Sequence, residues 1–178
     1  MDDFKKYSTK EVVKKRVSLI NASYHTRVSV KVITEGILSV TGLDTMIKNG
    51  SSKAVERITK CGDKHYFVFA TKYCCFGNPK KFPIYDSLSA KVLQWFYDWD
   101  NGYRGKCDDL CGNNTGLSVD KRSGTKWGGF KFTNFSSDYD YESYRKCIDA
   151  FISHYRLEVE DYKELDKFLW LVGKNMPD

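Results

Sequence analysis

The stretch that decides the fold runs from Phe69 to Asp86 and reads FATKYCCFGNPKKFPIYD. Two of the chain's three prolines, Pro79 and Pro83, lie inside it. Proline fixes its own φ angle and keeps the preceding residue extended, so this pair predicts a short, stiff connector after a helix. The connector brings the carboxylate of Asp86 to the start of the next helix, where aspartate is a favoured N-cap.

Hydrophobic periodicity predicts a helix on each side of this connector. Before the connector, apolar residues at helical spacing mark one face of a helix over about 65–76, namely Tyr66, Phe69, Ala70, Tyr73 and Cys74. Lys72 lies off that face, so we expect it to point to solvent or into a cleft. After the connector, a second apolar run predicts a helix over 87–99, with Leu88, Val92, Trp95, Phe96 and Trp99.

The rest of the chain also reads as helix. Further helices are predicted over 9–24, capped by Ser8 or Thr9, and over 27–41, 43–49, 52–60, 138–155 and 159–173. Glycines after the 27–41 and 159–173 segments, Gly42 and Gly173, are expected to end those helices. The sequence therefore predicts an all-α fold, with residues 1–178 in a single compact domain of about seven helices.

Residues 100–136 are expected to form a long irregular loop, because they hold more than half of the chain's glycines. Basic and aromatic side chains alternate there. Cations can contact phosphates and flat rings can stack on bases, so we expect a DNA-contacting loop. The alternative is a solvated loop that its aromatic residues anchor to the core. The candidate DNA-binding residues are Arg104, Lys121, Arg122, Lys126, Trp127 and Lys131.

Composition narrows the class of protein. The chain has 178 residues, 41% of them apolar, and a formal net charge of +6, which suits an acidic partner such as nucleic acid. It has no long apolar run and no apolar N-terminal segment, so a cytoplasmic protein without membrane contact is expected. Cys107 and Cys111 have the spacing of metal ligands, but the three histidines are scattered. We therefore expect neither a metal nor a cofactor.

Two segments resemble a known family. The helix with Ala70-Thr71-Lys72-Tyr73, followed by the connector that ends in Phe82-Pro83-Ile84-Tyr85-Asp86, is similar to the 8-oxoguanine-DNA-glycosylase-like branch of the helix-hairpin-helix DNA glycosylase superfamily. The segment KELDKFLW at 163–170 also resembles small proteins of that branch. The resemblance implies duplex DNA as the partner and cleavage of the N-glycosidic bond of a damaged or modified base. That base would be an oxidised purine, an alkylated base or a modified base of phage DNA.

The resemblance also implies catalytic residues. In the superfamily, a carboxylate just before a helix stabilises the positive charge that develops on the sugar, and Asp86 matches it. Bifunctional members add a lysine nucleophile, for which Lys72 is the first candidate and Lys64, in a remnant of the hairpin, the second. An overlay on the family's helix puts Val68 at the lysine position, so a glycosylase that uses water and Asp86 alone is an alternative.

The flipped base would need a flat surface in its pocket. Candidate base-stacking residues are Tyr85, near the motif, and Trp127 and Phe130 in the long loop. Because the family's Leu-Pro-Gly-Val-Gly-x-Lys hairpin is absent, a second function class stays open. It is a catalytically silent DNA- or protein-binding helical module that keeps the fold.

Overall fold

The computed structural model describes residues 9–62, 64–100 and 140–176. All eight regular elements in these ranges are α-helices, which confirms the all-α prediction. Their bounds are α1 (Lys10–Tyr24), α2 (Val30–Ser39), α3 (Leu43–Asn49), α4 (Lys53–Thr59), α5 (Phe67–Gly77), α6 (Ser87–Asp100), α8 (Tyr141–Tyr155) and α9 (Tyr162–Asn175). None of the described helices is both long and apolar enough to cross a membrane.

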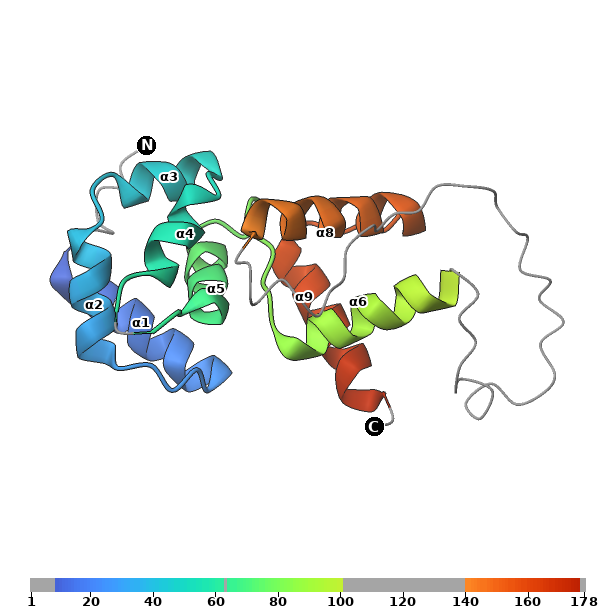
Figure 1. The fold of residues 1–178 in the computed structure, drawn as a ribbon, viewed down its shortest axis with the longest axis horizontal. Helices are drawn as coiled ribbons and strands as arrows, with labels where there is room; N and C mark the ends of the chain where they lie inside the picture. The colour runs from blue at the N-terminus through green and yellow to red at the C-terminus, as the bar shows by residue number, and fades with distance from the viewer. Residues whose placement is uncertain (1–8, 63, 101–139, 177–178) are drawn as a thin grey trace, which may run out of the picture.

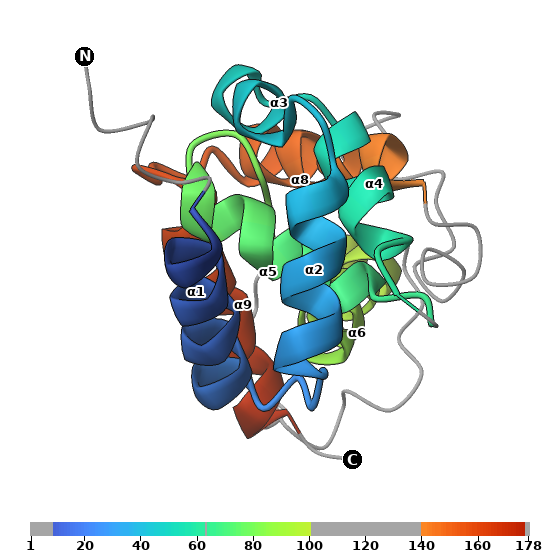
Figure 2. The same ribbon diagram turned by 90° about the vertical axis from the view of Figure 1, so that its left-hand side faces the viewer.

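The helices form two groups joined by the connector. Helices α1 to α5 make up one group, and α6, α8 and α9 make up the other (Figure 1). In the first group, α1 lies beside α2 and also contacts α5 (Figure 2). In the second group, α6 packs along α9. Buried apolar residues from both groups belong to one hydrophobic core.

Helix α5 lies at the centre of the fold and is buried on more sides than its sequence predicts. The residues of the expected apolar face are buried or nearly so, but Phe67, Thr71, Lys72 and Cys75 are buried as well. The reason is that α1, α3 and α4 all contact α5, and the end of the connector returns beside it. Cys74 and Cys75 are core residues.

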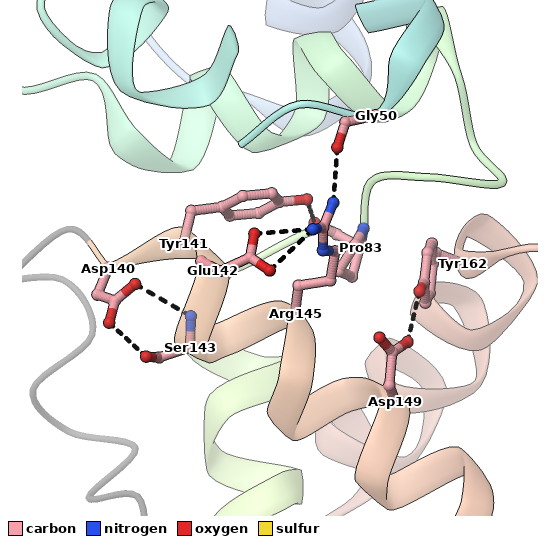
Figure 3. Close-up of polar contacts among 9 residues, drawn as sticks. All are labelled: Gly50, Pro83, Asp140, Tyr141, Glu142, Ser143, Arg145, Asp149 and Tyr162. Atoms are coloured by element: carbon pink, nitrogen blue, oxygen red, sulfur yellow. Dashed lines mark hydrogen bonds and ion pairs between the residues drawn. The ribbon is translucent and has the colours of Figure 1, made fainter. Parts of the chain in front are cut away.

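Hydrogen bonds from two helices, α5 and α8, fix the end of the connector. Thr71 Oγ1 accepts a hydrogen bond from the backbone N–H of Tyr85 at 3.1 Å. The Tyr141 hydroxyl donates to the Pro83 carbonyl at 2.9 Å, as Figure 3 shows, and the Tyr144 hydroxyl donates to the Ile84 carbonyl at 2.6 Å. These buried contacts fix the position and direction in which the chain reaches the first turn of α6.

Helix α8 links the two groups of helices. The Arg145 guanidinium donates to the Gly50 carbonyl at 2.6 Å and also pairs with Glu142 on its own helix (Figure 3). One turn further on, Asp149 accepts a hydrogen bond from the Tyr162 hydroxyl of α9. Helix α8 therefore contacts both the loop after α3 and the start of α9, and it fixes their positions relative to each other.

Several predicted helix bounds differ from the observed ones; α9, for example, begins at Tyr162 rather than at residue 159. Two of these differences have identifiable reasons. Helix α2 begins at Val30 rather than at residue 27, because His25 and Arg27 have left-handed backbone angles. The Asn21 side chain stabilises that turn by accepting a hydrogen bond from the backbone N–H of Val28. Helix α9 continues past Gly173, whose missing side chain lets it approach α6; a Cβ there would lie 3.0 Å from Val92 Cγ2.

Candidate active site

An open cleft of about 1140 Å³ lies beside the connector. Its walls come from both groups of helices. They are the end of α1 with the turn that follows, residues 65–69 with Lys72, residues 85–88, and the side of α9 from Lys163 to Leu171. Its volume lies slightly above the range of about 300 to 1,000 Å³ that is usual for ligand sites.

Asp86 reaches the cleft as the N-cap of α6. Its Oδ1 atom accepts a hydrogen bond from the backbone N–H of Ser89 at 2.9 Å, which confirms the predicted place of this carboxylate at a helix start. Its Oδ2 atom lies 3.9 Å from Nζ of Lys72. The Asp86 side chain is 16% exposed, so solvent and ligands can reach it from the cleft.

Lys72 faces into the same cleft from α5 rather than into open solvent. Its side chain is 6% exposed, and its Nζ atom lies 4.6 Å from the centre of the Tyr24 ring. Burial lowers the pKa of the Lys72 amine, while the charges of Asp86 and Asp166 act in the opposite direction. A lysine whose pKa is lowered by burial loses its proton more readily, and a neutral amine is a nucleophile.

A second carboxylate, Asp166 of α9, completes the charged cluster. The residue is 8% exposed, and its Oδ1 atom has no hydrogen-bond partner in the part of the chain that the structure describes. Burial, helped by the charge of Asp86, raises the pKa of Asp166 to about 7, although Lys72 and Lys163 oppose this shift. Asp166 can therefore bind or release a proton near neutral pH.

The aromatic ring of Tyr24, at the end of α1, packs against the Lys72 amine. Its ring also lies 5.9 Å from Nζ of Lys163. Burial, with the charge of Asp166 as the next cause, raises the pKa of Tyr24 to about 12, so the ring stays an uncharged phenol near neutral pH. A neutral ring under an amine stabilises the ammonium form through its π-electrons.

The other predicted site residues lie in different surroundings. Lys64 is exposed, precedes α5 and is not part of the cleft wall. Tyr85 lines the cleft, but its ring packs on Phe67 at 5.3 Å and on Tyr144 at 5.2 Å, and the residue is only 6% exposed. The remaining candidates lie outside the described residues: Arg104, Lys121, Arg122, Lys126, Trp127, Phe130 and Lys131.

The structure also shows how Val68 and Lys72 lie relative to the cleft. Val68 lines the cleft one helical turn before Lys72, so both residues reach the cleft from α5. A lysine nucleophile could therefore act from either of these turns, and in this chain the lysine occupies the later one.

Two residues of the site did not emerge from the sequence, Tyr24 and Asp166. A signal for Asp166 was available: it precedes Leu169 by three residues and follows Tyr162 by four, so helical spacing puts a carboxylate on the inward face of the last helix. Tyr24 carries no such signal. Within the described ranges, no three histidine, cysteine or acidic side chains lie together in a way that could hold a metal ion.

Comparison with known proteins gives two matches. A family model described as "HI_0787_N: N-terminal domain" matches residues 1–81, which span the first group of helices and end in the connector. The chain is 29% identical over 171 residues to an "Uncharacterized protein" of Haemophilus influenzae, covering 93% of this chain and 68% of that protein. This second similarity therefore extends beyond the first group of helices. No solved structure matches the chain.

Proposed function

We propose that this protein is a DNA glycosylase that cleaves the N-glycosidic bond of a damaged or modified base. The observation that carries the proposal is the pairing of Lys72 with Asp86 across 3.9 Å in an open cleft. This pair combines a partly desolvated amine with a carboxylate fixed at a helix start, the two groups that the bifunctional members of the resembled family use. The family resemblance of the residues around Lys72 and Asp86 supports the same activity.

Each residue has a defined role in the proposed reaction. The target nucleotide leaves the duplex and its sugar enters the cleft between Lys72 and Asp86. The Nζ atom of Lys72 attacks the sugar carbon that carries the base, and the bond to the base breaks. Asp86 opposes the positive charge that develops on the sugar, which is where a fixed charge accelerates a reaction most.

Duplex DNA is the proposed partner. The net charge of +6 favours an acidic polymer, and the cleft itself presents Lys163 and Lys167 beside the candidate catalytic residues. These two side chains lie where they can contact the phosphates that flank a flipped nucleotide.

Replacement of Asp86 by asparagine tests the proposal. Asparagine keeps the size of the side chain and still caps a helix, but it carries no charge. We expect Asp86→Asn to release base about 100- to 1000-fold more slowly than the wild type. The measurement is mass spectrometry of free bases after incubation with three duplexes, which contain an oxidised purine, an alkylated purine or a modified phage base.

The matched control is Asp140→Asn. Asp140 caps α8 through the backbone N–H of Ser143 at 3.0 Å and does not line the cleft, so it tests the loss of an N-cap charge alone. Base release should stay at the wild-type level in this variant. Equal base release by Asp86→Asn and the wild type would contradict the role of Asp86. If the wild type binds the duplexes but releases no base from any of them, a silent DNA-binding module replaces the proposed enzyme.

A further inference from the structure

The cleft contains a second carboxylate, Asp166, which has no role in the reaction proposed for Lys72 and Asp86. Asp166 enters from α9 and lines the cleft together with Lys72 and Asp86. The residue is 8% exposed, and one of its oxygens has no hydrogen-bond partner within the described ranges. A buried carboxylate without full hydrogen bonding is costly, so its retention in a cleft calls for a role.

We infer that Asp166 is the proton-transfer partner of Lys72, accepting the proton that the lysine must lose before attack and passing it to the leaving group. The inference rests on the proposed function, since it concerns how the same cleft operates. It gives the reaction a proton acceptor that is separate from Asp86, whose task is to oppose positive charge on the sugar.

The charges around Asp166 suit this role. Lys72 on α5, Asp86 at the start of α6 and Lys163 on α9 all act on its carboxyl group. The neutral groups Tyr24 on α1, Cys75 on α5 and Tyr144 on α8 also sense its charge, and burial raises the pKa of each of them. Because Lys72 and Asp166 have shifts in opposite directions, the free-energy cost of moving a proton from the amine to the carboxylate is reduced.

The proposed reaction needs no proton donor or acceptor other than Lys72, Asp166 and the leaving group. The Lys72 ammonium gives one proton to the Asp166 carboxylate and becomes a neutral amine. The amine's lone pair forms a bond to the sugar carbon, the bond to the base breaks, and its electron pair leaves with the base. The base takes the proton from Asp166, which returns to a carboxylate. On an abasic site, the same proton goes to the hydroxyl group that leaves as water when the iminium forms.

An abasic duplex with sodium borohydride tests the inference without knowledge of the target base. Borohydride reduces the iminium to a stable protein–DNA adduct, which a denaturing gel quantifies. We expect Asp166→Asn to form the adduct about 100-fold more slowly than the wild type, the usual contribution of a positioned proton-transfer group. The rate should also lose its dependence on pH around 7. Asp166→Glu, which restores a carboxylate, should recover part of the rate.

The sign of the effect separates proton transfer from simple electrostatics. Removing the negative charge of Asp166 lowers the pKa of Lys72 further, because that charge favours the ammonium form. An electrostatic role alone would therefore leave the rate unchanged or raise it near pH 8, where the Asp166 carboxyl group carries its charge. A proton-transfer role lowers the rate there, and sodium formate should restore it in Asp166→Ala by occupying the vacated space.

The control is Glu158→Gln, which removes the same charge at an exposed position outside the cleft and should match the wild type. Wild-type adduct formation with an unchanged rate in Asp166→Asn would overturn the inference and leave the Lys72 chemistry intact. A slow rate that neither Asp166→Glu nor formate restores would also overturn it. Absence of any adduct in the wild type would overturn both the lysine chemistry and the inference.

Discussion

At the residue scale, two carboxylates share one amine but lie in different environments. Asp86 accepts a backbone hydrogen bond from Ser89 at the start of a helix. Asp166 lies on a helix side, and one of its oxygens has no such partner within the described ranges. This contrast separates the roles that we propose for them, because one is held by the backbone while the other can exchange a proton near neutral pH.

The raised pKa of Asp166, about 7, predicts a pH dependence of stability. The folded state holds this proton more tightly than the unfolded chain, where an aspartate has a pKa of about 3.9. Wild-type stability is therefore lost progressively as pH rises from about 4 to about 7. Asparagine carries no titrating proton, so at about pH 8 Asp166→Asn should be more stable than the wild type, by about 2 to 4 kcal/mol.

Urea denaturation of the two proteins at about pH 5 and pH 8 measures this effect. The difference between their free energies of unfolding should be smaller at the lower pH than at the higher pH, where it should favour the variant. Glu158→Gln, which changes an exposed carboxylate, should follow the wild type at both pH values. An equal difference in the free energy of unfolding between Asp166→Asn and the wild type at both pH values would show that Asp166 does not titrate in this range.

At the element scale, the contacts of the connector with α5 and α8 determine where Asp86 lies in the site. The hydrogen bonds to Pro83, Ile84 and Tyr85 come from side chains that are almost fully buried. They hold the chain immediately before Asp86, and Lys72 follows Thr71 directly on α5. The distance between the two catalytic candidates therefore depends on these contacts.

Tyr141→Phe tests this dependence. The change keeps the buried ring and removes the hydroxyl that donates to the Pro83 carbonyl, leaving that carbonyl without this donor (Figure 3). We expect a loss of about 1 to 3 kcal/mol in the free energy of unfolding, the usual cost of an unsatisfied buried acceptor. Tyr162→Phe is the matched control, because its hydroxyl meets Asp149 at an exposed position and its loss should cost less. Equal urea midpoints for the two variants would contradict the connector's role.

The sequence predicted the elements better than it predicted their ends. Prolines and apolar periodicity were sufficient for α5, the connector and the N-cap Asp86, because these signals are local. The start of α2 was missed because Asn21 and the left-handed residues His25 and Arg27 determine it, and neither is a periodic signal. Helical spacing puts Asp166 on the inward face of α9, but the residues that surround it depend on how α9 packs against α6, which no local pattern contains.

At the scale of the whole molecule, the connector joins two groups of helices (Figure 1), and residues of both groups line the cleft. Lys72 comes from the first group, and Asp86 and Asp166 come from the second. The sequence therefore left Lys72 and Lys64 as alternatives, because only the packing of the groups puts one amine beside Asp86 and the other outside the cleft. The similarity to the Haemophilus influenzae protein likewise extends beyond the first group.

The most direct test of the account is to identify the residue that forms an adduct with DNA. The wild type is incubated with an abasic duplex and sodium borohydride, and the cross-linked peptide is mapped by mass spectrometry. We expect one adduct, at Lys72, that is lost in Lys72→Gln and kept in Lys64→Gln. No adduct with the wild type, or an adduct that persists in Lys72→Gln, would contradict the assignment of Lys72 as the nucleophile beside Asp86.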